Sequence, residues 1–409
     1  MLITQQILYR LLLCTVARSS GIGALLPGKT GLFFRERITI QKLPVFKEKP
    51  IWIHTASTGE YEQAEPLVKA IKKEFPHIPV VVSFFSPSGM LAKRGKTHAD
   101  AEIYMPVDCP SDAKRFIEKL NPRMAIFIKY EFWPEHLRIL AKKNIPVFSA
   151  SSVFRENNAV FKYAYLRNSL RYFEAFFVQD EKSKKILNSH GFRQVFVSGD
   201  TRFDSVAGLP SESVKFPILE DFGNQAKLII AGSTWPEDEK LLLRFMKNHA
   251  PENVKLVLIP HEPTPQHVRS LTQSIKLPYA RYSTYGKNDS QAKILIGDVT
   301  GLLKYIYRYG IFAYIGGGFG RGIHNILEAN TYGLPVIFGP RYRKFIEAVT
   351  LIEKGGAVSI RNEEELNRSF LLWLDPEKRN AAASIVRSFV QSNTGASERI
   401  LKHLKKFVS

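Results

Sequence analysis

The stretch IHTASTGEYEQAEPLVKAI (residues 53–71) begins as an apolar β-strand and ends as an α-helix. Between the two lies a turn of small residues, 56–59, and Glu60 follows it directly. In the second part, apolar residues recur on one helical face, at Ala64, Leu67, Val68 and Ile71. The stretch therefore predicts a strand–turn–helix unit of an α/β fold.

Glu60 has two interpretations. Ser57 and Glu60 have the spacing of a capping box, in which the glutamate side chain bonds back to the backbone at the start of the helix. Alternatively, its carboxylate takes a proton from a molecule bound above the turn. The local sequence alone favours the cap.

The same alternation of strand and helix continues along the chain. The first set of expected strands covers residues 51–54, 80–85, 101–106, 124–129, 146–151, 175–180 and 194–199. A second set covers residues 227–232, 255–260, 294–298, 312–318 and 335–340. Apolar strands separated by helices indicate parallel sheets that are covered on both faces.

A segment of turn formers, residues 199–217, has no sustained period and separates the two sets of strands. We therefore expect two doubly wound, Rossmann-like domains, residues 31–208 and 209–409, which face a central cleft. A membrane-associating segment, residues 1–30, precedes them.

The charge balance indicates the kind of partner. The 409 residues carry a formal net charge of +20, which favours a polyanionic partner such as nucleic acid, an anionic membrane or a phosphorylated substrate. The segment ILYRLLLCTVAR (residues 7–18) is too short and too charged to span a bilayer alone, so we expect a helix lying on anionic lipid. An ordinary packed helix is the alternative. The two cysteines, Cys14 and Cys109, make no disulfide framework, which is typical of a reducing cytoplasm.

Glycines dominate the stretch YIGGGFGRGIHNILE (residues 314–328). A strand leads into this turn and a helix is expected to begin near His324, so backbone amides of residues such as Gly318 could bind a phosphate, and Glu328 could bind ribose hydroxyls. A dinucleotide fingerprint is disfavoured because these glycines follow a late strand of their domain. A tight turn without a ligand remains an alternative. Ser233, in the turn after the first strand of that domain, repeats the arrangement more weakly.

A second carboxylate, Glu131, ends a strand in KYEFWP (residues 129–134) and could face the same cleft as Glu60. A surface acid is the alternative. His54 ends an apolar strand, and we expect a buried imidazole there rather than a base. His, Cys and acidic residues do not cluster at the spacing of metal ligands, so no metal site is expected.

Several of these motifs occur in the order found in one family. They are HTASTGEYEQAEP, SFFSPSG, YMPVD, KYEFWPEHL, VSGDTRFD, AGSTWPEDE and GGGFGRGIHNILE, and they extend over roughly residues 50 to 350. In this order they resemble the bacterial 3-deoxy-D-manno-octulosonic acid (Kdo) transferases of lipopolysaccharide biosynthesis. The resemblance implies a GT-B glycosyltransferase that inverts the anomeric centre, uses CMP-Kdo as donor and needs neither metal nor cofactor. It also implies a lipid A precursor as acceptor, anionic lipid but no nucleic acid as partner, and the cytoplasmic face of the inner membrane as location.

The resemblance assigns roles to particular residues. The proton acceptor of the family falls on Glu60, and an acidic group that stabilises the transition state falls on Glu131. A basic residue that shares this second role falls on Arg202, where the family motif has lysine. The contacts to CMP fall on Pro260, His261, Thr300, Gly301, Leu302, Asn325, Ile326, Leu327 and Glu328.

With the resemblance, the base becomes the favoured interpretation of Glu60. Another GT-B sugar-nucleotide transferase or an epimerase is the alternative function. A non-catalytic module that binds anionic lipid is a more distant one.

Overall fold

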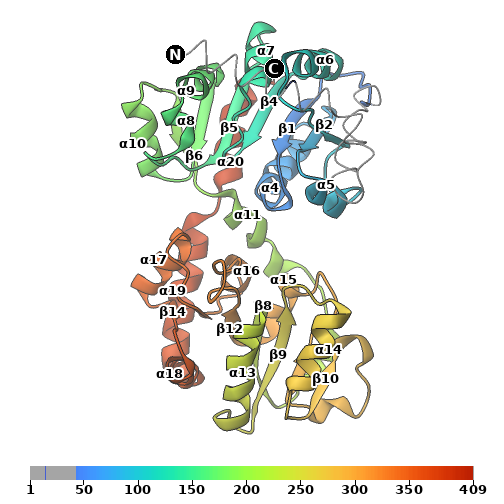
Figure 1. Ribbon diagram of the computed structural model, residues 1–409, viewed down its shortest axis with the longest axis vertical. Helices are drawn as coiled ribbons and strands as arrows, with labels where there is room; N and C mark the ends of the chain where they lie inside the picture. Colours follow the sequence, from blue (N-terminus) through green and yellow to red (C-terminus); the bar gives the residue numbers. More distant parts are fainter. Residues whose placement is uncertain (1–13, 15–42, 409) are drawn as a thin grey trace. The chain divides into compact units, whose positions relative to one another are not determined.

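The computed structural model describes residue 14 and residues 43–408, which form two compact units (Figure 1). The first unit is Met1–Ser205 with Asn393–Ser409, and the second is Val206–Ser392. Apart from Cys14, the expected membrane-associating segment 1–30 lies outside the described residues. Within the described part of the chain, no helix is both long and apolar enough to cross a bilayer.

The first unit is built on a parallel sheet of seven strands in the order β3-β2-β1-β4-β5-β6-β7. The strands are β1 (Ile51–Thr55), β2 (Val80–Phe84), β3 (Ala101–Tyr104), β4 (Met124–Ile128), β5 (Val147–Ser152), β6 (Ala175–Val178) and β7 (Val195–Val197). Strand β1 pairs with β2 on one side and with β4 on the other, so the strand order reverses between β1 and β4. In open α/β sheets, ligands bind at the carboxyl ends of the strands at such a point of reversal.

Helices cover both faces of this sheet, because successive strand residues point to opposite sides. Trp52 and Phe127 face a core formed with α6 (Pro110–Leu120), α7 (Pro134–Lys142) and α10 (Glu181–Ser189). Ile53 and Ile126 face the other core, formed with α4 (Thr58–Glu74) and α20 (Ala396–Leu404). The shorter helices of the unit are α5 (Pro87–Lys93), α8 (Ala159–Lys162) and α9 (Ala164–Ser169), and α11 (Thr201–Ala207) leads to the second unit.

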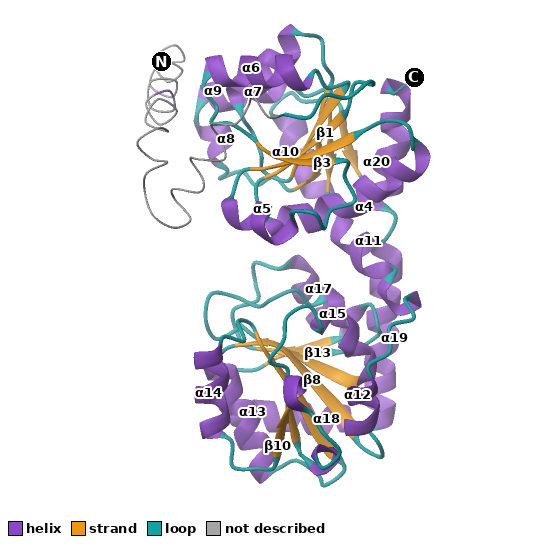
Figure 2. Ribbon diagram, turned by 90° about the vertical axis from the view of Figure 1, so that its right-hand side faces the viewer, coloured by secondary structure: helices purple, strands orange, loops and turns teal. Residues whose placement is uncertain are grey.

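The second unit has a parallel sheet of seven strands in the order β10-β11-β9-β8-β12-β13-β14. The strands are β8 (Lys227–Thr234), β9 (Val254–Pro260), β10 (Tyr279–Arg281), β11 (Ile294–Ile296), β12 (Gly310–Ile315), β13 (Val336–Phe338) and β14 (Ala357–Ser359). Its helices, which flank the strands in Figure 2, are α12 (Pro217–Phe222), α13 (Pro236–Asn248), α14 (Pro265–Ser274), α15 (Leu303–Ile306), α16 (Leu327–Asn330), α17 (Ile346–Lys354), α18 (Glu363–Leu374) and α19 (Pro376–Asn393). Here the order reverses between β8 and β12.

The predicted fold class, two doubly wound parallel sheets, is confirmed. All twelve expected strands are present with shifted ends, and two further strands, β10 and β14, were not expected. Both lie at an edge of the second sheet and have three residues each. Strands this short carry too little apolar pattern to be recognised from the sequence.

The end of the chain differs from the expected division into domains. Residues 393–409 belong to the first unit, and the boundary between the units falls after Ser205 rather than after residue 208. Asp204 helps to hold this last segment in the first unit, because its two carboxylate oxygens accept hydrogen bonds from Gly395 N and Ser397 N, each at 2.6 Å. Ile400 and Leu404 of α20 are buried in the core of the first unit. The basic end of the chain is thus a packed helix with a charged outer face.

Candidate functional site

Glu60 lies in the first turn of α4, directly after β1. Its Oε2 atom accepts hydrogen bonds from Ala56 N at 2.5 Å and from Ser57 N at 3.1 Å, so the cap predicted from the local sequence is present. Its Oε1 atom has no partner among the described residues, and the side chain is half-buried. One oxygen therefore orients the carboxylate, and the other remains available to a bound molecule.

The environment of Glu60 changes its proton affinity. Burial, and after it the nearby charge of Glu131, raises the pKa of Glu60 from 4.5 to about 7. The two backbone N–H groups and Lys129 act in the opposite direction but do not outweigh burial. A carboxyl group with this pKa can accept and release a proton near neutral pH, as a general base must.

Glu131 follows β4 in a short loop that begins with Lys129 in a left-handed conformation (φ 65°). The indole Nε1 of Trp133 donates a hydrogen bond to Glu131 Oε2 at 2.6 Å. His54 Nε2 lies 3.4 Å from the same oxygen, and the Glu131 side chain is only 14% exposed. The carboxylate is thus held by the indole N–H of Trp133 and lies against the His54 ring instead of extending into solvent.

The sheet topology explains why the two carboxylates are neighbours. Strands β1 and β4 are adjacent and parallel, so the residues that follow them meet at one edge of the sheet. Glu60 and Glu131 lie at this edge, where the strand order reverses. The predicted pair is thus brought together, and the effect of Glu131 on the pKa of Glu60 reflects this proximity.

Arg202, the third predicted residue of this group, lies in α11 and forms an ion pair with Asp200. Its Nε and Nη2 atoms lie 2.8 and 2.6 Å from Asp200 Oδ2. Gln63, on α4, donates to Asp200 Oδ1 at 3.4 Å. Arg202 also lies close enough to Tyr130 to lower the pKa of that phenol, although burial raises it overall. The guanidinium is therefore near the Glu131 loop, with part of its charge balanced by Asp200.

A groove of about 430 Å³ lies beside the Glu131 loop. Its lining residues come from that loop and from the segment around α8, and they are Tyr130, Phe132, Arg155, Asn158, Ala159, Val160 and Leu166. Apart from Arg155, Asn158 and the hydroxyl of Tyr130, the lining side chains are apolar. Arg155 is exposed, and no carboxylate among the described residues pairs with it. The groove thus combines an apolar wall with an unpaired cation.

The predicted donor-binding residues lie at the carboxyl edge of the second sheet. Ser233 is near the end of β8, in a left-handed conformation with φ 53°, and Gly318 follows β12. The other predicted contacts follow β9 (Pro260 and His261), β11 (Thr300, Gly301 and Leu302) and β12 (Asn325, Ile326, Leu327 and Glu328). Because all these strands are parallel, their carboxyl ends lie along one edge, which is where the prediction placed the site.

The glycines after β12 are required by close backbone packing. A Cβ atom at Gly316 would lie 2.2 Å from Ser233 O, and one at Gly318 would lie 2.5 Å from Gly339 N. Two amides of this turn are already bonded within the protein, since Gly316 N donates to Gly232 O at 2.9 Å and Gly317 N donates to Asp238 Oδ2 at 2.9 Å. The tight-turn interpretation therefore accounts for part of the glycine content.

The helix expected near His324 begins later. Helix α16 starts at Leu327 and has four residues. Asn325 Oδ1 accepts from Leu327 N at 3.0 Å at its start, and Gly333 has a positive φ of 76° after its end. The helix expected to begin near His324 thus begins three residues later and is short, and phosphate binding by the amides of this turn stays a prediction.

Three aromatic rings at this edge form a stack that sequence reasoning missed. The rings of His261 and His324 are stacked at 4.1 Å, and the ring of Trp235 is stacked on His261 at 5.2 Å. Trp235 Nε1 also donates to His324 Nε2 at 2.9 Å. Burial, and then the neighbouring His261, lowers the pKa of His324 to about 4, so its ring is neutral at physiological pH. Trp235 and His324 are far apart in sequence, so no local pattern could have indicated the stack.

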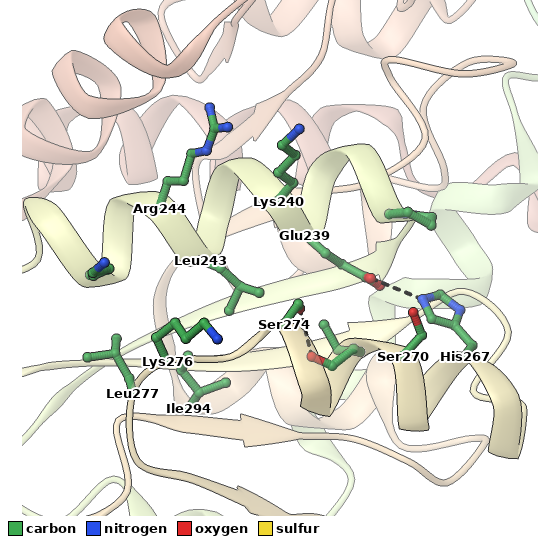
Figure 3. Close-up of a pocket in the computed structure, with 13 residues that line it drawn as sticks. Glu239, Lys240, Leu243, Arg244, His267, Ser270, Ser274, Lys276, Leu277 and Ile294 are labelled. Atoms are coloured by element: carbon green, nitrogen blue, oxygen red, sulfur yellow. Dashed lines mark hydrogen bonds and ion pairs between the residues drawn. The ribbon is translucent and has the colours of Figure 1, made fainter.

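Another groove of about 430 Å³ lies between α13 and α14 (Figure 3). Apolar side chains such as Leu243 and Ile294 line it together with Lys240, and Glu239 forms an ion pair with His267 at 3.0 Å. None of the predicted donor-binding residues lines this groove. Within residues 43–408, no three His, Cys, Asp or Glu side chains are grouped so that they could hold a metal ion.

Comparisons with known proteins agree with the motif order. Residues 33–205 match the family model described as 3-Deoxy-D-manno-octulosonic-acid transferase (kdotransferase). The chain is 26% identical to the 3-deoxy-D-manno-octulosonic acid transferase of Rickettsia felis over 382 residues, which cover 90% of this chain and 82% of the relative. It is 27% identical to that of Haemophilus influenzae over 376 residues, which cover 88% and 87%. The family model and the relatives thus support the Kdo transferase family that the motif order indicated. The predicted enzyme class, glycosyltransferase, is thereby confirmed.

Solved structures with the same fold include enzymes of two kinds. The UDP-GlcNAc 2-epimerase of Neisseria meningitidis bound to UDP-GlcNAc has a TM-score of 0.63 at 16% identity, with 87% of this chain and 100% of that chain covered. A glycosyltransferase of Rickettsia africae has a TM-score of 0.58 at 14% identity, with 89% and 100% covered. At these identities the likeness concerns the fold alone.

Proposed function

We propose that this protein is a Kdo transferase that moves Kdo from CMP-Kdo to a lipid A precursor, with inversion and without a metal, at the cytoplasmic face of the inner membrane. The names of the relatives support the transferred sugar. The observation that carries the mechanism is the environment of Glu60, whose free Oε1 and pKa of about 7 suit a general base beside a second carboxylate.

In the proposed reaction, an acceptor hydroxyl attacks the anomeric carbon of Kdo. The new bond joins the hydroxyl oxygen to that carbon, and the bond from the carbon to the CMP phosphate breaks. The hydroxyl proton passes to Glu60 Oε1, and CMP leaves with the bonding electrons. Because nucleophile and leaving group lie on opposite sides of the anomeric carbon, a single displacement inverts its configuration.

The cap and the base are compatible roles of one side chain. The bonds from Ala56 N and Ser57 N to Oε2 fix the direction in which Oε1 points. A base held in one orientation loses less entropy when the substrate arrives. Glu131 and Arg202 then stabilise charge that develops in the transition state, as their positions near the Glu60 edge allow.

The second unit would bind the donor at the carboxyl edge of its sheet. The flat stack of Trp235, His261 and His324 offers an aromatic surface there, and backbone groups near Ser233 and Gly318 offer polar contacts. The acceptor would lie in the first unit. The groove beside Glu131 has apolar residues for an acyl chain, and Arg155 for a phosphate. A net charge of +20 suits an enzyme that works on anionic lipid.

The decisive test is to incubate the full chain with CMP-Kdo and a tetraacylated lipid A precursor and to analyse the lipid by mass spectrometry. We expect a product that is heavier by one or more Kdo residues, together with free CMP. Parallel reactions receive UDP-GlcNAc or other UDP- and GDP-sugars, because the shared fold with an epimerase makes that activity the second candidate. Turnover of a UDP-sugar without turnover of CMP-Kdo would overturn the proposal. Salt-sensitive binding to anionic vesicles without turnover of any donor would favour a non-catalytic role.

A further inference from the structure

A series of buried side chains connects Trp52 to Glu131 within the first unit. Trp52 Nε1 donates a hydrogen bond to Ser83 Oγ at 2.7 Å, and Ser83 Oγ lies 2.8 Å from His54 Nδ1. On the other side of the imidazole, His54 Nε2 lies 3.4 Å from Glu131 Oε2. Trp52, His54 and Ser83 have no exposed surface, so water does not compete for these contacts.

The hydrogen bonds determine which nitrogen of His54 carries the proton. The indole N–H of Trp52 can only donate, so Ser83 Oγ is its acceptor, and the hydroxyl hydrogen of Ser83 needs an acceptor of its own. Among the described residues, His54 Nδ1 is the acceptor within reach of that hydroxyl. Nδ1 is then unprotonated, and the neutral ring carries its hydrogen on Nε2, which faces Glu131. The opposite tautomer would point a lone pair at the carboxylate and leave the Ser83 hydrogen without an acceptor.

A second donor reaches the same carboxylate oxygen. Trp133 Nε1 donates to Glu131 Oε2 at 2.6 Å, and the Trp133 ring lies edge-on to His54 with 5.8 Å between centroids. Glu131 Oε1 has no partner among the described residues. Two ring nitrogens thus converge on one oxygen and leave the other free.

Hydrogen bonds to Asp108 fix the start of α7, the helix that directly follows the loop of Glu131 and Trp133. Asp108, in the motif YMPVD, accepts hydrogen bonds from Glu135 N at 3.0 Å and His136 N at 2.9 Å, in the first turn of α7. His136 Nδ1 lies 2.6 Å from the same carboxylate. His136 is as deeply buried as His54 but contacts Asp108 instead of Glu131.

We propose that His54 is a positioning residue for Glu131: fixed as its Nε2–H tautomer by Ser83 and Trp52, it holds the carboxylate in the orientation in which it acts on the substrate. The inference rests on the proposed function, in which Glu131 stabilises the transition state. It also agrees with the expectation that His54 is a buried imidazole and not a base. The 3.4 Å contact is longer than an ordinary hydrogen bond, and such contacts shorten in many enzymes when substrate binds.

The kinetic test compares substitutions at two histidines of the first unit and at two buried hydroxyls. His54→Ala should lower kcat for Kdo transfer about tenfold to a hundredfold, the range found for outer-shell partners of metal ligands, with KM unchanged. His54→Gln, whose amide N–H can reach toward Glu131, should recover part of that loss. Ser83→Ala should lower kcat less, because the imidazole stays but its tautomer is no longer fixed.

Two control variants separate positioning from general damage to the core. His403→Gln removes a half-buried imidazole that lies edge-on to Phe177 in the other core of the first unit, so it should lower stability and leave kcat near the wild-type value. Thr55→Val removes a buried hydroxyl that donates to Ser83 O at 3.3 Å, so it matches Ser83→Ala without touching Ser83 Oγ. Equal losses of kcat in His54→Ala and His403→Gln would overturn the inference.

Nuclear magnetic resonance of histidine-labelled, full-length protein gives a readout that needs no activity. At neutral pH the ring nitrogens of His54 should show a protonated Nε2 and an unprotonated Nδ1. Ser83→Ala should weaken this preference, and Glu131→Gln should shift the Nε2 resonance. A protonated Nδ1 in the wild-type protein would overturn the assignment.

Glu131→Gln also distinguishes the two possible failures. If it turns over as fast as the wild type, the proposed role of Glu131 fails, and the positioning role of His54 fails with it. If it is impaired while His54→Ala is not, only the inference about His54 fails.

Discussion

Glu60→Gln should inactivate the enzyme and at the same time stabilise its fold. The glutamine oxygen can still accept from Ala56 N and Ser57 N, since Gln serves in capping boxes as Glu does. It cannot accept a proton from the acceptor hydroxyl. Activity should therefore fall about 10²–10⁴-fold, the usual contribution of a general base.

The gain in stability follows from the pKa of Glu60. A rise from 4.5 to about 7 on folding corresponds to about 3 kcal/mol by which the ionised carboxylate destabilises the folded state. In the wild type this cost is absent below pH 4.5, where the group is protonated in both states. It grows as pH rises to about 7 and is then constant. Glu60→Gln avoids this cost. Its free energy of unfolding should therefore be close to that of the wild type at pH 4.5 and about 3 kcal/mol higher at pH 8.

Denaturant unfolding at pH 5, 6, 7 and 8 measures this difference in the free energy of unfolding. Glu60→Ala is the matched control, because it also removes the charge but loses both bonds of the cap. It should gain about 1 kcal/mol less than Glu60→Gln at every pH. A difference between wild type and Glu60→Gln that does not change with pH would refute the raised pKa. Normal turnover by Glu60→Gln would refute its role as base.

Three further predictions concern other parts of the chain. Glu131→Gln removes the charge that helps to raise the pKa of Glu60, so the acid limb of the pH–rate profile of its residual activity should move to lower pH than in the wild type. Asp204→Asn weakens the two bonds to Gly395 N and Ser397 N; it should lower stability by about 1–2 kcal/mol in thermal unfolding and make residues 393–409 easier to remove by protease. His324 has a pKa lowered from 6.5 to about 4, so the wild type should lose stability as pH falls from 6.5 toward 4, and His324→Gln should lose less over that interval in acid unfolding.

The fold could be predicted because its signal is local. Runs such as residues 80–85 and 124–129 are apolar except for Ser83 and Lys129, which indicates buried parallel strands, and the long segments between them have a helical period. The positions of Glu60 and Glu131 followed from the same reasoning, since both come directly after a strand. Helix α20 could not be assigned to the first unit in this way, because the contact that holds it joins Asp204 to residues nearly 200 positions later.

The details of the site depend on contacts that local patterns do not contain. Ser83 meets Trp52 and His54 across neighbouring strands, about 30 residues away in sequence. The same holds for the stack of Trp235 on His261. The sequence left open whether the glycines after β12 serve a ligand or a tight turn, and the structure shows that Gly316 and Gly318 are needed because another backbone segment passes too close for a side chain. A sequence shows that a turn is rich in glycine, but the structure is needed to see what fills the space beside it.

The pH dependence of kcat/KM for Kdo transfer tests the central claim most directly, because it reports the ionisation of the free enzyme's base. With CMP-Kdo and a lipid A precursor, the rate should rise with pH through a midpoint at about 7, the pKa of Glu60. The slow residual reaction of Glu60→Gln should lack this rise. A midpoint near 4.5, or an unchanged rise in Glu60→Gln, would contradict the account.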